Sequence, residues 1–303
     1  MRTAKRLSDV LKKSEVIEFD DNSKIILMSD CHRGDGNWND QFARNQNIFS
    51  RALIHYFNEG YTYIELGDGD ELWEIKKMSD IINTHNDVFE IMSKFYNDNR
   101  LHLIYGNHDI VKSKQKLLDK HFFKYVNDIT GEEGKLFSNV KIHEGLLLKH
   151  KDTRKTILLT HGHQGDLFSD GLWRVSRFLV RYIWRNLELL GFKDPTRSAK
   201  NNKAKTIIEN KISKWSKDNN QMIITGHTHR PHFPKIGETL YFNDGSAVHP
   251  RCITGIEINK GDISLIKWST LTRDNGNLYV GKDIINGPVK INEFFEKTAK
   301  NLR

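Results

Sequence analysis

Arg100-Leu101-His102-Leu103-Ile104-Tyr105-Gly106-Asn107-His108-Asp109 is the stretch of sequence that decides the fold. Its first half alternates apolar and polar residues as a half-buried β-strand does, and the strand pattern ends at a glycine. Three side chains that can bind a metal ion or transfer a proton follow. On its own this stretch also fits a hairpin turn, so its meaning depends on the rest of the chain.

Four other apolar runs end in the same kinds of residue. Aspartate or histidine follows each of them, in Asp30-Cys31-His32 after residues 24–28, Gly67-Asp68-Gly69-Asp70-Glu71 after 61–66, His161-Gly162-His163 after 155–160, and Gly226-His227-Thr228-His229 after 221–225. In α/β sheets, ligands bind at the carboxyl ends of the strands. We therefore expect the five strand ends to meet in one site.

The order of the elements predicts an α/β fold. A short helix is expected within residues 1–23, and longer helices are expected at 41–57 and 80–96, between the first three strands. Further strands fit residues 239–242, 253–258 and 263–268. This number of strands is too large for one doubly wound sheet. We therefore expect one domain, residues 1–303, in which two sheets form a β-sandwich flanked by helices.

Residues 166–220 interrupt the strands with a segment that carries helix signals alone. An amphipathic helix is predicted from Leu167 to Phe192, a basic loop over 193–205, and a second amphipathic helix over 204–215. Four arginines lie on one face of the first helix: Arg174, Arg177, Arg181 and Arg185. Because the segment lies between two ligand-bearing strand ends, it is predicted to form a helical cap over the site.

Two interpretations of this insertion are open. Its apolar face can pack on its own domain, with the arginines in solvent. Alternatively, the apolar and basic faces together hold an amphiphile with a phosphate headgroup or rest on an anionic membrane. The insertion also contains aromatic residues, but the chain shows no recognised nucleic-acid module, so nucleic acid is not expected as a partner.

Composition limits the class of protein. The 303 residues include 47 Lys+Arg against 39 Asp+Glu, and this excess of eight positive charges favours an anionic partner such as a phosphate or an acidic lipid surface. No apolar run approaches the roughly 18 residues of a membrane span, and the N-terminal residues lack the apolar stretch of a signal peptide. Two cysteines, Cys31 and Cys252, provide no disulfide framework. We expect a cytoplasmic protein, either free in the cytoplasm or in peripheral contact with a membrane.

Seven side chains at the strand ends are potential metal ligands: Asp30, His32, Asp68, Asn107, His161, His227 and His229. They offer oxygen and imidazole nitrogen but no thiolate, which favours Mn²⁺, with Fe or Zn²⁺ as alternatives, over a structural zinc site. Side chains alternate along an extended segment, so Cys31 and Thr228 are expected to point away from the metals. Seven ligands suit two ions roughly 3.5–4 Å apart, bridged by a hydroxide and one carboxylate, for which Asp68 is the candidate.

Catalysis requires further side chains beside these ligands. His108 is the candidate general acid for the leaving group, and Asp109 is expected to hold its ring. Arg33 and Arg230 follow the first and last ligand pairs and are candidates for binding phosphate oxygens. His163 is a further candidate for binding substrate. Two acidic residues are expected to support the ligands or cap the loop: Asp70 and Glu71.

The five stretches, in this order from Asp30 to His229, resemble the motif set of the calcineurin-like metallophosphoesterases. The resemblance implies a double β-sandwich flanked by helices and a dinuclear metal centre that hydrolyses phosphoesters. It also implies two sets of metal ligands, one formed by Asp30, His32, Asp68 and His229 and the other by Asp68, Asn107, His161 and His227. His108 matches the family's catalytic histidine.

A second, more distant resemblance concerns residues 67–71, the basic helical insertion after His161, and residues 226–231. These features are similar to those of the UDP-2,3-diacylglucosamine pyrophosphatases, which cleave a lipid-linked diphosphate under a helical cap. The chain departs from these enzymes at His108, where they usually carry arginine. Histidine at this position is the pattern of the wider superfamily.

The sequence therefore predicts a metal-dependent phosphoesterase that hydrolyses a phosphate ester or a pyrophosphate bond, with a nucleotide-sugar or lipid-linked compound as substrate. A serine/threonine phosphoprotein phosphatase is the alternative within the same chemistry. A non-catalytic, metal-stabilised membrane adaptor is the alternative from another class. The presence of His108, which metal binding does not require, is evidence against that adaptor.

Overall fold

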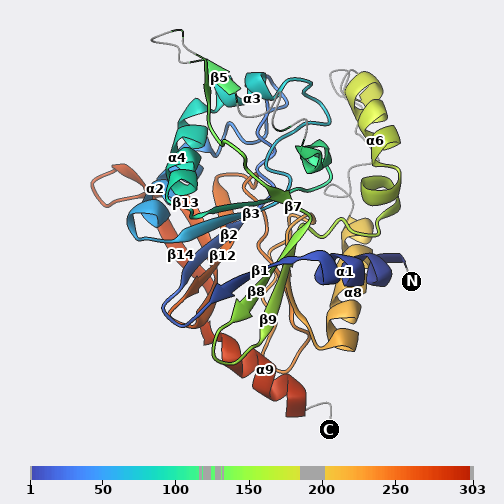
Figure 1. Ribbon diagram of the computed structural model, residues 1–303. Coiled ribbons are helices and arrows are strands. Elements are labelled where there is room, and N and C mark those ends of the chain that lie inside the picture. Colours follow the sequence, from blue (N-terminus) through green and yellow to red (C-terminus); the bar gives the residue numbers. More distant parts are fainter. Residues whose placement is uncertain are drawn as a thin grey trace.

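A computed structural model gives the structure of the protein and describes residues 2–115, 118, 124–126, 131, 133–184 and 202–300. Two β-sheets pack face to face, and helices cover the outer side of each sheet (Figure 1). The α/β two-sheet architecture predicted from the sequence is confirmed.

The larger sheet has seven strands, in the order β14 (Leu278–Lys290), β13 (Asp262–Thr272), β12 (Cys252–Asn259), β2 (Lys24–Met28), β3 (Thr62–Leu66), β4 (Leu101–Ile104) and β7 (Ile142–His143). The smaller sheet has five, in the order β1 (Glu15–Phe19), β8 (Gly145–His150), β9 (Thr156–Thr160), β10 (Met222–Thr225) and β11 (Tyr241–Asn243). A separate antiparallel pair joins β5 (Lys124–Val126) and β6 (Glu133–Lys135). Parallel pairing relates β2, β3 and β4, and it also relates β9 and β10.

The inner faces of the two sheets share one hydrophobic core. Leu27 and Ile64 of the larger sheet pack with Leu159 and Ile224 of the smaller one, and all four side chains are fully buried. Each of these strands is nearly continuous in apolar residues, because its other face is covered by a helical layer. The short apolar runs seen in the sequence are therefore strands buried on both faces.

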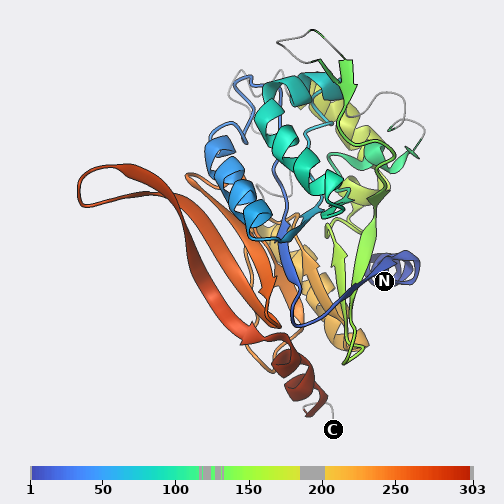
Figure 2. The ribbon, with the colours of Figure 1, turned by 60° about the vertical axis from the view of Figure 1, so that its left-hand side comes forward.

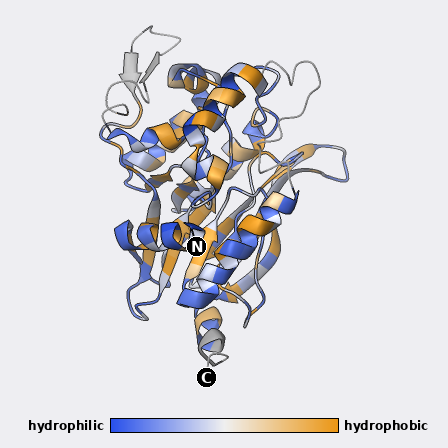
Figure 3. Ribbon diagram, turned by 90° about the vertical axis from the view of Figure 1, so that its right-hand side faces the viewer, coloured by the Kyte–Doolittle hydropathy of each residue, from blue (hydrophilic) through white to orange (hydrophobic). Residues whose placement is uncertain are grey.

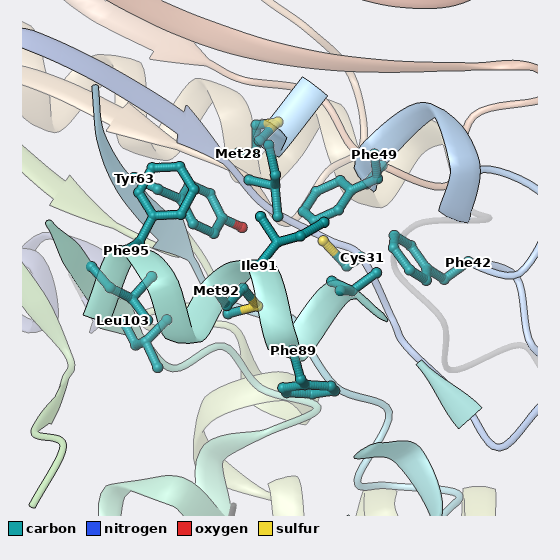
Figure 4. Packing of buried hydrophobic residues seen from close by; sticks show 14 of the residues in the cluster. Met28, Cys31, Phe42, Phe49, Tyr63, Phe89, Ile91, Met92, Phe95 and Leu103 are labelled. Atoms are coloured by element: carbon teal, nitrogen blue, oxygen red, sulfur yellow. The ribbon is translucent and has the colours of Figure 1, made fainter. Parts of the chain in front are cut away.

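Three helices cover the larger sheet: α2 (Gln46–Asn58), α3 (Met78–Thr84) and α4 (Asn86–Asn97). Their apolar residues form a second core with the outer face of the sheet, in which Phe49, Phe89 and Phe95 are fully buried (Figure 4). Cys31 lies in this core, so its side chain points away from the strand ends as predicted.

Two helices cover the smaller sheet: α1 (Arg2–Lys13) and α8 (Asn202–Asn219). Leu7 and Val10 of α1 pack with Ile212 and Trp215 of α8 against the sheet, while the opposite faces of these amphipathic helices carry polar residues (Figure 3). The second helix predicted within the cap, residues 204–215, is part of α8. Its buried face thus belongs to the layer that covers the smaller sheet.

The first helix predicted within the insertion is described as far as Trp184. It consists of a π-helical turn η2 (Leu167–Gly171), helix α6 (Trp173–Leu179) and a second π-helical turn η3 (Val180–Trp184). From here on, the cap means residues 167–184, the described part of this first helix, and no longer the whole predicted insertion. Arg6 of α1 holds its base through a hydrogen bond of 2.9 Å from Nε to Asp170 Oδ2. The remainder of that predicted helix, with Arg185, and the predicted loop up to residue 201 lie outside the described residues.

Several elements differ from the sequence prediction. The predicted helix 80–96 is two helices, because the chain breaks at His85, whose buried ring forms 2.8 Å hydrogen bonds with Asp40 and Gln46. The sequence pattern misses β1, β5, β6, β7, β8 and β14. β1 and β14 are edge strands with mostly exposed side chains, and β14 forms a long hairpin with β13 that extends beyond the rest of the sheet (Figure 2).

Two further helical segments complete the described chain: the 3₁₀ turn η1 (Ile110–Ser113) and the helix α9 (Ile291–Lys300). Among the residues that the structure describes, no helix combines the length and the apolarity needed to cross a bilayer.

Candidate metal centre

The ends of five parallel strands meet at one side of the sandwich. β2, β3 and β4 are neighbours in the larger sheet, and β9 and β10 are neighbours in the smaller one. Hydrogen bonds join the two sheets here: His161 Nδ1 donates to Leu66 O at 2.9 Å, and the backbone N–H of His227 donates to Asp30 Oδ2 at 2.8 Å. The structure therefore brings the predicted ligands together.

The first cluster of possible metal ligands contains Asp30, His32 and His229. Asp30 Oδ1 lies 3.0 Å from His229 Nε2 and 3.7 Å from His32 Nε2. The two Nε2 atoms face each other at 3.3 Å. Two imidazole nitrogens and a carboxylate oxygen that converge in this way can bind a divalent cation between them.

The second cluster contains Asp68, His161 and His227. Asp68 Oδ2 lies 3.1 Å from His161 Nε2, and the same oxygen lies 3.8 Å from His32 Nε2 of the first cluster. Asp68 is therefore the carboxylate between the two clusters, the position expected of a bridging ligand. Asn107 stands beside it, because the N–H of the next residue, His108, donates to Asp68 Oδ1 at 2.7 Å.

Several ligand atoms at this centre are buried without a hydrogen-bond partner within the described part of the chain. They are Asp30 Oδ1, Asn107 Oδ1, His161 Nε2 and His227 Nε2. A buried polar atom left unpaired costs about 1–3 kcal/mol, so native proteins rarely leave several together. Metal coordination would satisfy all four atoms at once. The side chains present thus fit the pair of divalent ions expected from the sequence.

The backbone at these ligands is strained. Five of the seven predicted ligands have positive φ angles although none is glycine: Asp30 (51°), His32 (48°), Asp68 (48°), His227 (68°) and His229 (52°). Such conformations cost of order 1 kcal/mol or more each and persist where the surrounding structure enforces them. Two glycines allow the ligand loops to approach, because a Cβ on Gly106 would lie 2.1 Å from Asp68 Oδ1 and one on Gly226 2.5 Å from Asp30 Oδ2.

His108 lies beside both clusters, held by residues other than the one predicted. Its Nδ1 is 2.7 Å from Glu71 Oε1, while the other oxygen of Glu71 is 2.9 Å from His32 Nδ1. The indole of Trp73 stacks on the His108 ring, with centroids 4.3 Å apart and planes 21° apart. The His108 ring is thus fixed by a carboxylate on one edge and an aromatic plane on one face.

Asp109 does not hold the His108 ring, which corrects the prediction. Its carboxylate accepts hydrogen bonds from the backbone N–H groups of Gly106 at 2.6 Å and Gly69 at 3.2 Å, and from Lys112 Nζ at 2.8 Å. Asp109 therefore ties together the two loops that carry Asp68 and Asn107. Glu71, rather than Asp109, holds the His108 ring.

Arg33 is not available to bind substrate, which corrects a second prediction. Its side chain is 1% exposed. Its guanidinium binds both oxygens of Glu65 at 2.8 and 2.9 Å and donates from Nε to Asp70 Oδ1 at 2.6 Å. Asp70 also binds Lys112. Burial lowers the pKa of Arg33, but attraction to Asp70, and then to Glu65, outweighs burial and raises this pKa well above its usual value. Arg33 thus belongs to a buried charge network beneath the centre.

Arg230 and His163 lie closer to the expected positions. Arg230 is on the rim, where Nη1 donates to Glu209 Oε2 of α8 at 3.0 Å and the side chain remains 41% exposed. His163 is buried beside the second cluster, with its ring centroid 5.4 Å from that of His161. Both His163 ring nitrogens lack a hydrogen-bond partner among the described residues. Substrate binding by these two residues stays a prediction.

Comparison with known proteins decides the family. Residues 24–257 match the calcineurin-like phosphoesterase superfamily domain. That match covers most of the chain and all five strand ends. The chain belongs to the calcineurin-like phosphoesterase superfamily. No curated protein sequence matches the chain.

Two solved structures to which this calcineurin-like phosphoesterase domain is similar have low sequence identity. The crystal structure of Chaetomium thermophilum Vps29 has 10% sequence identity and a TM-score of 0.38, with 88% of this chain and 96% of that chain covered. The same protein complexed with the RaPID-derived cyclic peptide RT-D3 has 12% identity and a TM-score of 0.31, with 88% and 98% covered. At these scores the similarity supports no conclusion about function.

Electrostatics at the centre of this calcineurin-like phosphoesterase domain divide the histidines into two kinds. Burial alone would lower the pKa of His161, but the carboxylates of Asp68 and Asp30 raise it to about 9. Burial also opposes protonation of His32, and hydrogen bonds with Asp30 and Glu71 raise its pKa well above the usual value. Burial and the neighbouring His161 lower the pKa of His227 to about 4. In the metal-free protein, the pKa of about 9 at His161 and the raised pKa of His32 both favour the protonated ring at neutral pH.

Metal binding is expected to release these protons, because a cation binds the neutral imidazole. Titration of the metal-free protein with Mn²⁺ at pH 7 should release about one to two protons per molecule, and the affinity should rise with pH until His161 loses its proton near pH 9. Calorimetry in buffers of different ionisation enthalpy measures the release. His161→Gln removes a metal ligand together with its proton, so it should bind less metal and release about one proton fewer per molecule. Heats that do not depend on the buffer would contradict the assigned protonation.

The sequence does not predict which residues hold the His108 ring. It predicts only a supporting role for Glu71 and no role for Trp73. The signal for Glu71 is its place three residues after Asp68 in the same loop, which lets it face the next strand end. Trp73 has a weaker signal, a large aromatic residue in a loop between two ligand-bearing strands.

Proposed function

We propose that the protein is a metal-dependent hydrolase that cleaves a phosphate ester or a pyrophosphate bond with two divalent metal ions, Mn²⁺ first among the candidates. The observation that supports this most strongly is the pair of neighbouring ligand clusters with Asp68 between them, in which four buried ligand atoms form no hydrogen bond with the described residues. Membership of the calcineurin-like phosphoesterase superfamily supports the same class of chemistry.

The ligands and their neighbours have separate tasks in this proposal. Two divalent ions, when bound, stabilise charge on the phosphoryl oxygens and lower the pKa of a bound water. Asp30, His32 and His229 would hold one ion, and His161, His227 and Asn107 the other, with Asp68 between them. The hydrogen bond that His161 Nδ1 donates to Leu66 O fixes His161 with Nε2 toward Asp68, as the ligand role requires.

His108 serves the leaving group. Its Nδ1 is engaged by Glu71, which leaves Nε2 as the atom that donates a proton to the departing oxygen. Although burial opposes ionisation, attraction to His108 and hydrogen bonds from His108 and His32 hold the pKa of Glu71 well below its usual value. The Glu71 carboxylate therefore stays charged and holds the His108 ring at Nδ1.

A small phosphorylated compound, a nucleotide sugar or a lipid-linked phosphate is the proposed substrate, and the cap supplies the support for the last of these. Leu172, Val175 and Phe178 of the cap are 42%, 54% and 56% exposed. An apolar surface of this kind beside a phosphate site suits an acyl chain, and the net positive charge of the protein suits an anionic membrane. The proposed location is the cytoplasm, with peripheral contact to such a membrane.

A substrate panel tests the proposal. Protein loaded with Mn²⁺, Fe²⁺ or Zn²⁺ should hydrolyse at least one phosphate monoester, phosphodiester or nucleotide diphosphate, and removal of metal by a chelator should abolish turnover. Re-addition of the metal should restore it, which excludes damage by the chelator. If the metal-loaded protein hydrolyses none of these compounds, the proposed enzymatic function is wrong.

The alternatives leave different results in the same panel. A serine/threonine phosphoprotein phosphatase would prefer phosphopeptides over nucleotide sugars. A metal-stabilised membrane adaptor would bind anionic liposomes and hydrolyse nothing. The contact of His108 with Glu71 and Trp73, which metal binding does not need, favours an enzyme over the adaptor.

A further inference from the structure

Residues 71–75 form a compact loop between the cap and the metal centre. The N–H of Glu71 donates to Arg33 O, and the N–H of Ile75 donates to Glu71 O, both at 3.0 Å. These bonds close the segment into one turn, and its side chains are buried. A displacement at one end of so short a turn is therefore transmitted to the other end.

Arg181 of the cap donates hydrogen bonds to backbone carbonyls of this loop. Its Nε donates to Trp73 O at 2.9 Å, and its Nη2 donates to Leu72 O at 2.6 Å and to Ile75 O at 3.1 Å. A guanidinium presents several donors in a fixed plane, so three carbonyl bonds fix both the position and the orientation of the loop. Lys76, directly after the loop, adds a second contact by lying 5.3 Å from the ring centroid of Tyr182 in η3.

The inner side of the same loop carries the groups that hold His108. Glu71 binds the His108 ring nitrogen, and Trp73 stacks on the ring. The indole N–H of Trp73 also donates to Asn107 O, directly before His108 in the chain. Arg181 thus contacts the backbone carbonyl of Trp73, and His108 contacts its indole ring.

We infer that Arg181 is a positioning residue that sets the orientation of His108 through the loop 71–75, so that the cap controls proton donation to the leaving group. This inference rests on the proposed function, because it assigns a task to His108 in hydrolysis. It gives the cap a role in the chemical step, separate from any role in binding substrate. It also predicts that the effect of Arg181 depends on how much the leaving group needs a proton.

The test uses the full-length, Mn²⁺-loaded protein and two water-soluble substrates. 2,4-Dinitrophenyl phosphate has a leaving group that departs without a proton, whereas phenyl phosphate requires one. Arg181→Ala should lower kcat for phenyl phosphate about 10- to 100-fold, as a displaced catalytic group does, and leave kcat for the dinitrophenyl ester within about twofold. KM and bound metal should be unchanged. Arg181→Lys, which keeps the charge but loses the planar fork, should fall between the two.

Arg174→Ala is the matched control, because Arg174 lies in the same helical segment over the Trp173 ring and is exposed. It should leave both rates unchanged. In a His108→Ala background, Arg181→Ala should have no further effect on phenyl phosphate, since the group that it positions is already gone.

Other results overturn the inference. Equal losses on both substrates, or loss of metal, would show that Arg181 acts only on the stability of the centre. Unchanged rates for both substrates in Arg181→Ala and Arg181→Lys would show that the cap does not influence His108. If the wild-type protein hydrolyses neither ester, nor any compound of the wider panel, the proposed function itself has failed.

Discussion

Asp68→Ala is expected to remove metal binding and hydrolysis together. The Asp68 carboxylate lies 3.1 Å from His161 Nε2 and 3.8 Å from His32 Nε2, so it connects the two clusters. Burial opposes its charge, but His161 and His108 hold the pKa of Asp68 far below its usual value, so it is an anion at every working pH. Alanine leaves both clusters short of negative charge and of one ligand each.

The expected size is a loss of about 10³-fold or more in kcat/KM, equivalent to about 4 kcal/mol of transition-state stabilisation. Metal analysis by mass spectrometry should show fewer than two ions per molecule. His227→Ala should behave similarly, because it removes a ligand of the second cluster. Asp152→Ala, which deletes an exposed carboxylate in the turn after β8, is the control and should match the wild type. Two tightly bound ions in Asp68→Ala would contradict the shared position of this carboxylate.

His108→Ala is expected to separate metal binding from turnover. His108 stands beside both clusters, but the proposed ligand sets do not include it, so the variant should keep its two ions. Loss of a general acid costs about 10²–10⁴-fold in rate, and the loss should be largest for substrates with poor leaving groups. His55→Ala is the control, since His55 packs on Trp268 in the α2 layer.

Steady-state kinetics and metal analysis of the same His108→Ala sample measure both effects. A variant with full metal content and full turnover would remove His108 from the mechanism and strengthen the case for another proton donor. A variant that loses its metals would make His108 a ligand, in line with its place beside His32 and Glu71 in a third group of possible metal ligands.

The strands that carry the centre could be predicted from the sequence because each is buried on both faces. Residues 24–28 are predicted as a strand and form β2 with the same bounds, and the other four ligand-bearing strands agree within one residue at either end. Apolar runs that end in glycine, aspartate or histidine mark these strand ends directly. The edge strand β14 could not be found in this way, because its side chains are mostly exposed and lack an apolar alternation.

The substrate and orienting residues were harder to predict, because adjacency in sequence does not give the direction of a side chain. If the segment 30–33 were extended, alternation would place Cys31 and Arg33 on the face opposite to Asp30 and His32. Cys31 and Arg33 are both buried under the centre, although Asp30 and His32 have positive φ angles and the segment is not extended. Asp109 was paired with His108 as its neighbour in sequence, whereas Glu71 reaches His108 from another strand end.

Long-range contacts explain the break in the predicted helix 80–96. Apolar residues continue on both sides of His85, with Ile82 before it and Val88 after it. The break follows from the hydrogen bonds of the His85 ring with Asp40 and Gln46, which belong to a segment about forty residues earlier. Tertiary contacts of this kind leave no trace in local periodicity.

The N-terminal helix α1 fastens both margins of the insertion, through Arg6 on Asp170 and through Leu7 and Val10 beside Trp215. The entropy cost of closing a loop between two fixed anchors grows only slowly with its length. A change in the length of the intervening segment therefore costs little conformational entropy and need not alter the register of either sheet. The segment between these two anchors can therefore differ in length or sequence without moving the strands that carry the metal ligands.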